Sequence, residues 1–496
     1  MTGYNPMLLT DWYKQSHIAQ YPPGTETVYS TWIPRDSGIP GVDEVVAFGF
    51  QAFIIQWLIR YFDKWFFTMP WTELKKDFDT VVRSALGTAD PDSSHFQALH
   101  ELGYLPLRIR AVPEGTLVPL RVPMLTIENT LPEYFWLTNF IETLFSSECW
   151  LPSTSATIAL EFRKIFDHYA NVTGYDKEFA QWQGHDFSMR GMASLSAAAA
   201  SGAAHLLSFT GTDTIPGMLF ARDYYDADLA NELVAGSVPA TEHSVMCAYG
   251  QDEHASFKRL LTEVYPTGIV SIVSDSYDLW KILGDVLPGL RDVIMERDGR
   301  LTIRPDSGDP VKIVCGDPDA DGMAEIGAYG LLCEVFGADK NDQGYMELDT
   351  HVGLIYGDAI NLDRCERICA GLEAKGIAPS NLVLGIGSFS YQFQSRDTFG
   401  FALKSTWVQR NGQGIHIFKD PVTDDGMKRS LTGRVGVVRD GDTLKVVDHL
   451  DEDLPKSEDV LEDVFIDGDL VRKETFSQIR ARLAEQRELR AQKIVG

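Results

Sequence analysis

Three short motifs in the middle of the chain combine residue types that bind aromatic rings and phosphate groups. They are His185-Asp-Phe-Ser-Met-Arg-Gly191, Phe209-Thr-Gly-Thr-Asp-Thr214 and Pro239-Ala-Thr-Glu-His-Ser244. Phe187 offers a stacking surface and Asp213 an acceptor for an amide N–H, while Arg190 and His243 add a cation and a titratable base. The set suits a sugar-phosphate donor that reacts with a flat heteroaromatic nucleophile. Structural alternatives remain open: a core ring, a helix cap and a structural histidine.

Two glycine-containing turns and one charged turn are further candidates for binding phosphate. Gly385-Ile-Gly387-Ser388 and Tyr356-Gly357-Asp358 each follow an apolar run, where backbone N–H groups can hold an anion. The glycines can instead serve only the conformation of the turn. Arg304-Pro-Asp306-Ser-Gly-Asp309 joins a guanidinium to carboxylates that suit ribose hydroxyls or Mg²⁺. Its alternative is a capped turn with an internal ion pair.

The segment 396–434 carries a local excess of positive charge. It holds seven Lys and Arg residues against four acidic ones, inside a chain with 44 Lys+Arg, 71 Asp+Glu and a net charge of -27. Such a local excess can capture a polyphosphate, although it can also be ordinary mixed-charge surface. The basic residues are Arg396, Lys404, Arg410, Lys419, Lys428, Arg429 and Arg434.

Composition indicates a globular protein and argues against several other classes. With 496 residues, of which 44% are hydrophobic, the chain can bury large cores. Its negative charge disfavours nucleic acid and anionic membranes as partners. The six scattered cysteines form no disulfide framework or metal knuckle. We find neither a secretory signal nor a transmembrane run, and we expect a cytoplasmic protein.

The pattern of apolar runs predicts an α/β protein with strands of two kinds. Short alternating runs near Val28–Ile33, Tyr104–Ile127 and beyond Phe401 indicate antiparallel strands, with helices over Leu131–Phe145 and Ser155–Ala170. After residue 180, near-continuous apolar runs alternate with helical segments, which favours a parallel barrel or a doubly wound sheet whose polar strand ends share one rim. Those runs are Leu206–Phe209, Ile269–Val273, Leu301–Ile303, Val352–Ile355 and Leu382–Ile386.

Several longer motifs, in the same order along nearly the whole chain, resemble the nicotinamide phosphoribosyltransferase family. They are Leu9-Thr-Asp-Trp-Tyr-Lys14, His185-Asp-Phe187, Gly211-Thr-Asp-Thr214, Ser237-Val-Pro-Ala240, Val273-Ser-Asp-Ser-Tyr-Asp278, Ile303-Arg-Pro-Asp-Ser-Gly308 and Phe418-Lys-Asp-Pro-Val422. The resemblance implies a type II phosphoribosyltransferase fold, an irregular (β/α) barrel over residues 181–399. A second, mixed α+β sheet domain would be built from residues 1–180 and 400–496.

The same resemblance implies roles for individual residues. Phe187 would stack on a pyridine ring, with Tyr13 of a partner chain on its other side, and Asp213 would accept the carboxamide N–H. His243 would be the histidine that ATP phosphorylates. Residues expected at the ribose and phosphates are Arg190, Arg304, Asp306, Gly357, Asp358, Gly387 and Arg396. Residues expected on the pyrophosphate and ATP side are Arg35, Lys404, Lys419, Lys428 and Arg429.

The expected reaction condenses nicotinamide with 5-phosphoribosyl 1-pyrophosphate in NAD salvage, with Mg²⁺ and with ATP as a co-substrate. A homodimer with active sites at the subunit interface is expected as well, while the Mg²⁺ ligands stay unassigned. Two alternatives remain, a nicotinate phosphoribosyltransferase and a non-catalytic signalling protein on the same scaffold. A lyase or aldolase barrel would require a buried Schiff-base lysine at a strand end, and the sequence offers none.

Overall fold

The computed structural model describes residues 3–89, 91–419 and 430–495, and these residues form two compact units. The first unit contains Met1–Thr154, Ala221–Ala227 and Gln394–Gly496, and the second contains Ser155–Phe220 and Asp228–Phe393. The sequence analysis assigned residues 155–180 to the domain of the two termini, whereas in the structure they group with the barrel. The reason is that one long helix, α5 (Leu137–Thr173), runs from the first unit into the second.

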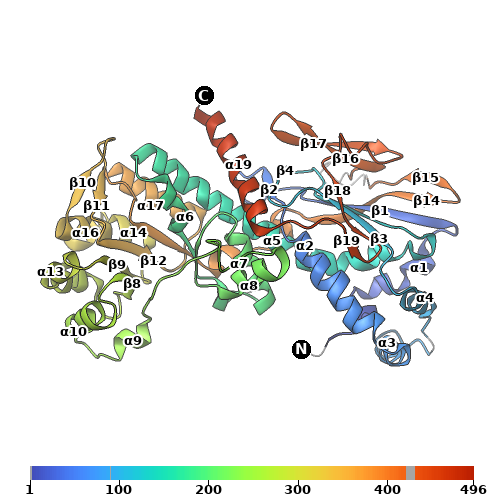
Figure 1. The fold of residues 1–496 in the computed structure, drawn as a ribbon, viewed down its shortest axis with the longest axis horizontal. Coiled ribbons are helices and arrows are strands. Elements are labelled where there is room, and N and C mark those ends of the chain that lie inside the picture. Colours follow the sequence, from blue (N-terminus) through green and yellow to red (C-terminus); the bar gives the residue numbers. More distant parts are fainter. Residues whose placement is uncertain (1–2, 90, 420–429, 496) are drawn as a thin grey trace. The chain divides into compact units, whose positions relative to one another are not determined.

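The first unit is built on a seven-stranded antiparallel sheet that draws strands from both ends of the chain (Figure 1). Its strands, in spatial order, are β15 (Gln413–His416), β14 (Ala402–Arg410), β1 (Thr25–Ile33), β5 (Leu125–Asn129), β3 (Leu107–Ala111), β18 (Glu462–Ile466) and β19 (Asp469–Leu470). Two small antiparallel pairs join β2 (Glu44–Val46) with β4 (Leu117–Pro119), and β16 (Arg434–Asp440) with β17 (Thr443–Leu450). The strands expected over Val28–Ile33 and beyond Phe401 are therefore confirmed.

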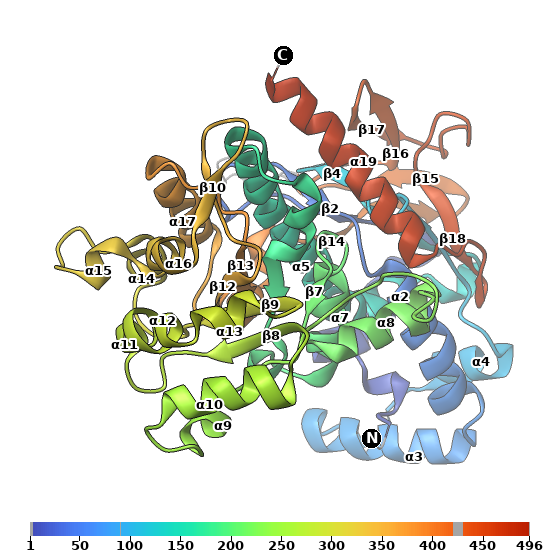
Figure 2. The ribbon, with the colours of Figure 1, turned by 60° about the vertical axis from the view of Figure 1, so that its left-hand side comes forward.

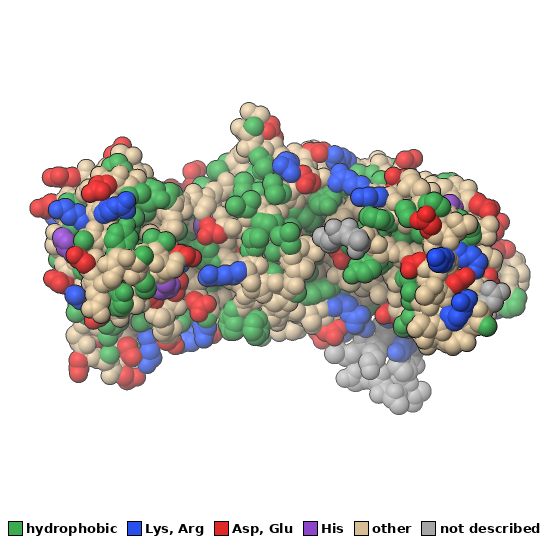
Figure 3. All heavy atoms as spheres, turned by 90° about the horizontal axis from the view of Figure 1, so that it is seen from below, with side chains coloured by type: hydrophobic (Ala, Val, Ile, Leu, Met, Phe, Trp, Pro, Cys, Tyr) green, Lys and Arg blue, Asp and Glu red, His purple; other side chains and the backbone are tan. Residues whose placement is uncertain are grey.

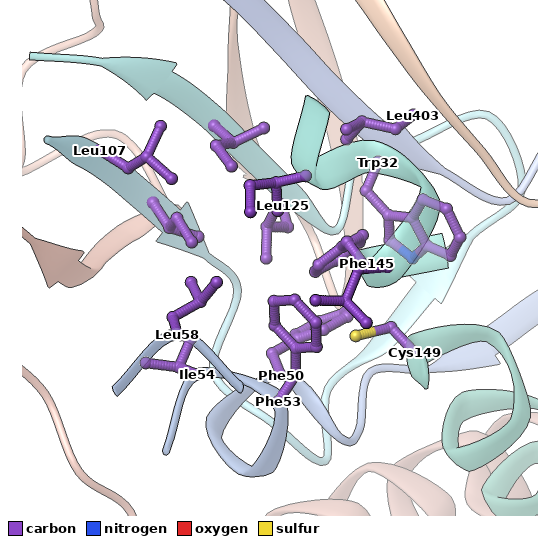
Figure 4. Packing of buried hydrophobic residues seen from close by; sticks show 14 of the residues in the cluster. Trp32, Phe50, Phe53, Ile54, Leu58, Leu107, Leu125, Phe145, Cys149 and Leu403 are labelled. Atoms are coloured by element: carbon purple, nitrogen blue, oxygen red, sulfur yellow. The ribbon is translucent and has the colours of Figure 1, made fainter. Parts of the chain in front are cut away.

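The helices of the first unit are α1 (His17–Gln20), α2 (Phe50–Phe53), its π-helical continuation Ile54–Tyr61, α3 (Trp71–Leu86), α4 (Ser94–Leu102) and α19 (Phe476–Val495). Apolar residues from Phe50 to Tyr61 and from α3 and α4 share one buried cluster with residues of the sheet. Trp32 of β1 stacks on Phe401 at 5.1 Å between ring centroids and meets Phe145 of α5 edge-on at 5.0 Å. Figure 4 shows Trp32 and Phe145 in one cluster with Phe50 and Phe53. This aromatic core, which is fully buried, gives the sheet a rigid base.

The second unit is an irregular barrel of parallel strands. Its sheet has the order β7 (Gly211–Thr212), β6 (Gly184–Asp186), β13 (Leu382–Ile386), β12 (Val352–Tyr356), β9 (Gly299–Arg304) and β8 (Gly268–Val273). The segment 236–240 joins the two edges, because Gly236 bridges Gly211 and Ala240 bridges Ser271, both in parallel. The expected barrel is confirmed, and it closes through isolated bridges instead of a regular strand.

Helices follow most strands of the barrel and cover its outside (Figure 2). They are α6 (Ala180–Gln183), α7 (Leu195–His205), α8 (Ile215–Tyr225), α9 (His243–Cys247), α10 (Glu253–Arg259), α11 (Leu279–Lys281), α12 (Leu287–Gly289), α13 (Arg291–Met295), α14 (Pro310–Cys315), α15 (Met323–Ile326), α16 (Ala328–Phe336), α17 (Leu362–Ala374) and α18 (Ser388–Tyr391). A small hairpin joins β10 (Ala338–Lys340) to β11 (Met346–Leu348).

Two predictions of secondary structure from the sequence were wrong. Leu206–Phe209 is not a strand but the turn that ends α7, where the Phe209 N–H donates to the His205 carbonyl at 3.1 Å. A buried helix end and a buried strand both appear as a continuous apolar run, so periodicity cannot separate them. The two helices expected over residues 131–145 and 155–170 are one helix, α5, with Pro152 inside it.

Among the described residues, no helix is long and apolar enough to cross a membrane.

Candidate active site

A cavity of about 450 Å³ lies inside the barrel of the second unit. Its walls are mostly apolar and come from the inward-facing residues of the parallel strands, including Ile269, Ile355 and Val383. Phe187, Asp213 and Arg304 also line it, together with Ser237. Phe187, Asp213 and Arg304 were predicted from the sequence as site residues, and the structure brings them to one cavity. They lie at or just after the carboxyl ends of β6, β7 and β9, where barrels place their active sites, while the same cavity also reaches Arg300 and Gly353 near the amino ends of β9 and β12.

Asp213 is held as a carboxylate at the wall of this cavity. Its Oδ1 accepts hydrogen bonds from His185 Nε2 at 2.9 Å and from Ser237 Oγ at 2.7 Å. Partial burial raises the pKa of Asp213, but these hydrogen bonds and the charge of Arg304 outweigh it, so the pKa is lowered overall. No described residue donates to Oδ2, and the side chain is 43% exposed. Asp213 therefore keeps an ionised oxygen that can accept an N–H from a ligand.

Phe187 is positioned by a close approach of two backbones. Its N–H donates to the Ile386 carbonyl at 3.0 Å, which places the ring directly after β6 and beside β13. A Cβ on Gly385 would lie 2.5 Å from Phe187 Cδ2, so only glycine leaves room for the ring. The Arg304 guanidinium carbon lies 5.8 Å from the ring centroid, and the His185 ring is tilted against Phe187 at 4.7 Å. The ring thus forms one fixed wall for a flat ligand.

Arg304 and Asp306 form a partly buried ion pair at the end of β9. Arg304 Nη2 lies 3.2 Å from Asp306 Oδ2, while Arg304 Nε and Asp306 Oδ1 are buried without a partner among the described residues. Burial raises the pKa of Asp306, and the nearby Asp275 adds to the increase. A Cβ on Gly357 would overlap Asp306 Oδ1, which explains this glycine. Arg304 Nε can therefore donate a hydrogen bond to a phosphate or ribose oxygen, and Asp306 Oδ1 can accept one from a ribose hydroxyl or bind a cation.

Asp309, in the same turn, has a structural role. Its Oδ1 accepts from the backbone N–H groups of Val311 at 2.9 Å and Lys312 at 3.3 Å, so it caps the N-terminus of α14. The capped-turn interpretation therefore holds for Asp309. Among the described residues, no group of three or more His, Cys, Asp and Glu side chains has the arrangement of a metal site. Asp306 Oδ1 is a buried carboxylate oxygen without a partner among the described residues, and carboxylate oxygens are ligands that Mg²⁺ accepts.

His243 lies at the first turn of α9 and is oriented by Asp275, a residue that the sequence analysis did not select. Asp275 Oδ1 lies 3.0 Å from His243 Nε2, and Oδ2 accepts from the backbone N–H groups of Asp306 and Ser307, both at 2.8 Å. Burial raises the pKa of Asp275, but the donors from Ser307, Asp306 and His243 outweigh it and the pKa is lowered. Asp275 follows β8 at the predicted polar rim, and this position in the sequence could have identified it as a site residue.

The remaining predicted residues of the second unit lie in neighbouring turns of the same rim. Arg190 is exposed in the 3₁₀ turn Met189–Gly191, and a Cβ on Gly191 would overlap Ser388, so this turn packs against the start of α18. Gly387 is the N-cap of α18, with open space where a side chain would begin. Asp358 is exposed next to Gly357.

The other predicted residues belong to the first unit. Arg35, Lys404 and Lys419 line a cavity of about 670 Å³. Tyr13 is 60% exposed, and the Arg396 side chain is 50% exposed and lies 3.2 Å from Asp397. Lys428 and Arg429 lie outside the described residues. Figure 3 shows acidic and basic side chains mixed over the face that it draws.

Two family models match the chain. Residues 5–61 match the N-terminal domain of nicotinamide phosphoribosyltransferase, and residues 182–466 match the nicotinate phosphoribosyltransferase (NAPRTase) family. Among solved structures, nicotinate-nucleotide pyrophosphorylase from Pyrococcus furiosus superposes with a TM-score of 0.57 at 15% identity, covering 98% of this chain and 96% of its own. Human nicotinic acid phosphoribosyltransferase gives 0.54 at 16% identity, covering 97% and 93%. These two structures share the fold.

Curated relatives align over almost the full length. The nicotinamide phosphoribosyltransferase of Acinetobacter baylyi is 47% identical, covering 98% of this chain and 98% of its own, and that of Xanthomonas campestris pv. campestris is 35% identical, covering 96% and 97%. With these identities, and with a family model that spans more than half of the sequence, the chain belongs to the nicotinate phosphoribosyltransferase family and is a phosphoribosyltransferase.

Proposed function

We propose that this phosphoribosyltransferase acts on nicotinamide. The ring nitrogen of nicotinamide attacks C1 of 5-phosphoribosyl 1-pyrophosphate, pyrophosphate leaves, and nicotinamide mononucleotide is formed for NAD salvage. The observation that carries the choice of base is the ionised Asp213 beside the Phe187 ring, in one cavity with Arg304. The relatives with printed nicotinamide phosphoribosyltransferase names support the same choice.

The base is selected by the sign of the charge at Asp213. Its Oδ1 is occupied by His185 and Ser237, so Oδ2 is the oxygen that accepts a carboxamide N–H. The carboxylate of nicotinate would instead meet a like charge in a mostly apolar cavity. Because Asp213 is 43% exposed in the free chain, we place the discrimination at the lower end of a range of roughly 2–4 kcal/mol, about thirtyfold.

The sugar-phosphate donor is bound by residues at the carboxyl ends of the barrel strands. Arg304 stands over Phe187, where it can stabilise charge on the departing pyrophosphate, and Asp306 Oδ1 is a free acceptor for a ribose hydroxyl or for Mg²⁺. Mg²⁺, when bound, would supply further neutralisation of the pyrophosphate. Stacking on Phe187 holds the weak ring nucleophile in line with C1, so positioning and electrostatics carry the catalysis.

ATP coupling through His243 is the second part of the proposal. His243 is 48% exposed, and its Nε2 faces the Asp275 carboxylate at 3.0 Å. A neutral histidine that donates Nε2–H to Asp275 leaves the Nδ1 lone pair available for the γ-phosphorus of ATP. The buried Asp275 would also stabilise the positive charge that the ring gains on phosphorylation, as the acidic member of a catalytic triad does.

A homodimer with shared active sites completes the proposal. Tyr13 belongs to the first unit and is 60% exposed; its ring meets the His17 ring edge-on at 5.1 Å and lies 5.4 Å from Lys14 Nζ. Such an exposed aromatic side chain, rimmed by charges, is typical of a contact with a second chain. There it would close the open side of the pyridine ring bound on Phe187.

The choice of base is tested by Asp213→Asn. Asparagine keeps the oxygen that accepts from His185 and removes the charge, so the ratio of kcat/KM for nicotinamide to that for nicotinate should fall about thirtyfold. Asp363→Asn, the same change at a side chain that is 71% exposed on α17, is the matched control and should leave the ratio unaltered. An Asp213→Asn enzyme with the parental ratio would refute the assignment.

The coupling is tested by His243→Ala. This variant should lose the stimulation of mononucleotide formation by ATP and keep ATP-independent condensation, because His243 contacts no group that binds the base. The assay compares the steady-state rates of mononucleotide formation with and without ATP and measures the release of phosphate from ATP. Stimulation of the variant equal to that of the parent would remove His243 from this role.

A further inference from the structure

A fully buried glutamate of the first unit lies outside the proposed active site and links two helices. Glu114 is 3% exposed, and its carboxylate accepts three hydrogen bonds. Gly49 N–H donates to Oε2 at 2.7 Å and Gln51 N–H to Oε1 at 2.6 Å, so the carboxylate caps the start of α2. The hydroxyl of Tyr225, the last residue of α8, donates to Oε2 at 2.8 Å. Glu114 therefore joins the start of α2 to the end of α8.

The Glu114 carboxylate has no cation of its own. Glu474 lies beside it and accepts from the Glu114 backbone N–H at 3.0 Å. The two neighbouring arginines pair with Glu474, Arg482 at 2.7 Å and Arg472 at 3.2 Å, whereas Glu114 forms no ion pair with a described residue. Burial raises the pKa of Glu114 to about 7 against the hydrogen bonds that it accepts, and the charge of Glu474 adds to the increase. This carboxyl therefore titrates near neutral pH.

The hydroxyl of Tyr225 lets this site hold a proton without losing a partner. When Glu114 is ionised the hydroxyl donates to it, and when Glu114 is protonated its own O–H can donate to the Tyr225 oxygen. The two backbone N–H groups keep their acceptors in both states, because a carboxylic acid retains lone pairs on both oxygens. Burial raises the pKa of Tyr225 and of the nearby Cys149 well above the usual range, so both stay neutral. Protonation therefore removes a buried charge while Glu114 keeps all three partners.

Two cavities that share one residue lie between this carboxyl and solvent. The inner cavity, of about 10 Å³, is lined by Glu114, Glu474 and Arg472 and is about the size that one water molecule needs. The outer cavity, of about 560 Å³, is lined by Arg472 and by Lys456, whose side chain is 87% exposed. Arg472 Nε is buried without a partner among the described residues. A water molecule in the inner cavity can accept from this Nε and exchange a proton with Glu114.

We propose that Glu114 is a buried proton-binding site that anchors the start of α2 and the end of α8 firmly when protonated and loosens them when ionised. Protons reach it through the two cavities, past Arg472. The direction follows from linkage, because the pKa of Glu114 is higher in the folded chain than its ordinary value of 4.5. Its stabilisation is complete below pH 4.5 and is lost as the pH rises through about 7.

The first test is infrared titration of the folded full chain. Ordinary carboxyl groups are ionised above pH 6, so a carboxylic acid band that disappears with a midpoint near pH 7 should report Glu114. The band should vanish in Glu114→Gln. Glu148→Gln is the matched control, because burial raises the pKa of Glu148 as well, and the band should survive it. A parent without this band, or a band that survives Glu114→Gln, would overturn the proposal.

A second variant keeps the titration informative if Glu114→Gln does not fold. Tyr225→Phe removes only the hydroxyl, and the ionised carboxylate then loses a donor. Because a hydrogen bond to a charged acceptor is stronger than one to a neutral group, the midpoint of the band should move to higher pH. A midpoint in Tyr225→Phe equal to that of the parent would refute the assignment of the band to Glu114.

The second test is hydrogen exchange of the full chain at pH 6 and pH 8, corrected for the intrinsic exchange rate at each pH. The amides of residues 49–53 and Ala221–Ala227 should open about tenfold more often at pH 8 in the parent, and equally at both pH values in Glu114→Gln. Helix α17 of the barrel is the internal control and should show no such change. Equal protection of both segments at the two pH values in the parent would rule out the pH-dependent anchoring.

Discussion

Replacing Gly385 by alanine should displace the ring of Phe187 and so weaken the binding of nicotinamide. The new Cβ would lie 2.5 Å from Phe187 Cδ2, 2.9 Å from Cε2 and 3.0 Å from the Gly357 Cα. Carbon atoms pack best at about 3.5–4.0 Å, so the overlap with the ring is about 1 Å. The third contact is backbone of the neighbouring strand, which cannot retreat, and the ring must therefore move.

The magnitude follows from what the ring would lose. Stacking of a base on an aromatic side chain contributes about 1–3 kcal/mol, so the dissociation constant for nicotinamide should rise about 5- to 150-fold. Overpacking should also cost about 1–3 kcal/mol of stability. In a Phe187→Ala background the clash with the ring is absent and only the contact with the Gly357 Cα at 3.0 Å remains, so the added alanine at 385 should there cost less stability than in the parent, which a double-mutant cycle measures.

Gly387 provides the matched control two residues away. A Cβ there has no neighbour within 4 Å, and φ is -102°, which any residue adopts. Gly387→Ala should therefore leave both nicotinamide binding and the melting temperature near the parental values, whatever it does to the phosphoribosyl donor. The assay is titration of nicotinamide with thermal unfolding as the check on folding. Parental affinity in a folded Gly385→Ala variant would refute Phe187 as the stacking wall.

Two further predictions concern stability and assembly. Burial lowers the pKa of His205 to about 4, with its Nε2 at 3.0 Å from the Gly211 carbonyl and its Nδ1 at 2.7 Å from the Tyr391 hydroxyl. The unfolded chain then binds the extra proton between about pH 4 and 6.5, so this stabilisation is complete above pH 6.5 and is lost on acidification. The stability gap between the parent and His205→Gln should shrink by roughly 2 kcal/mol from pH 7.5 to 4.5 in urea unfolding, and an unchanged gap would contradict the pKa. For the proposed dimer, mixing inactive Tyr13→Ala and Asp213→Ala chains should restore about a quarter of the parental activity through hybrid dimers, whereas mixtures as inactive as either chain alone would argue against shared sites.

Local sequence was sufficient for the parallel strands and for the rim at their carboxyl ends. The runs in β8, β9, β12 and β13 are continuous because these strands are largely buried on both faces, as Leu301 and Leu354 show on one face with 0% exposure and Ile355 on the other with 6%. The polar residues that follow each run must then meet at one edge, whatever the details of the helices between them. This is why Arg304 and Asp306, at and after the end of β9, could be selected from the sequence, whereas the run before Asp213, Leu206–Phe209, is the end of a helix.

The tertiary structure decided what depends on contacts between distant segments. Asp275 became part of the site only when the turn after β8 and the turn after β9 were brought together. The barrel closes through the bridges of Gly236 and Ala240, which carry no strand pattern. The periodicity of apolar residues reports whether one segment is buried. The orientation of side chains, the closure of the barrel and backbone strain depend on how several segments pack together, so no single segment predicts them.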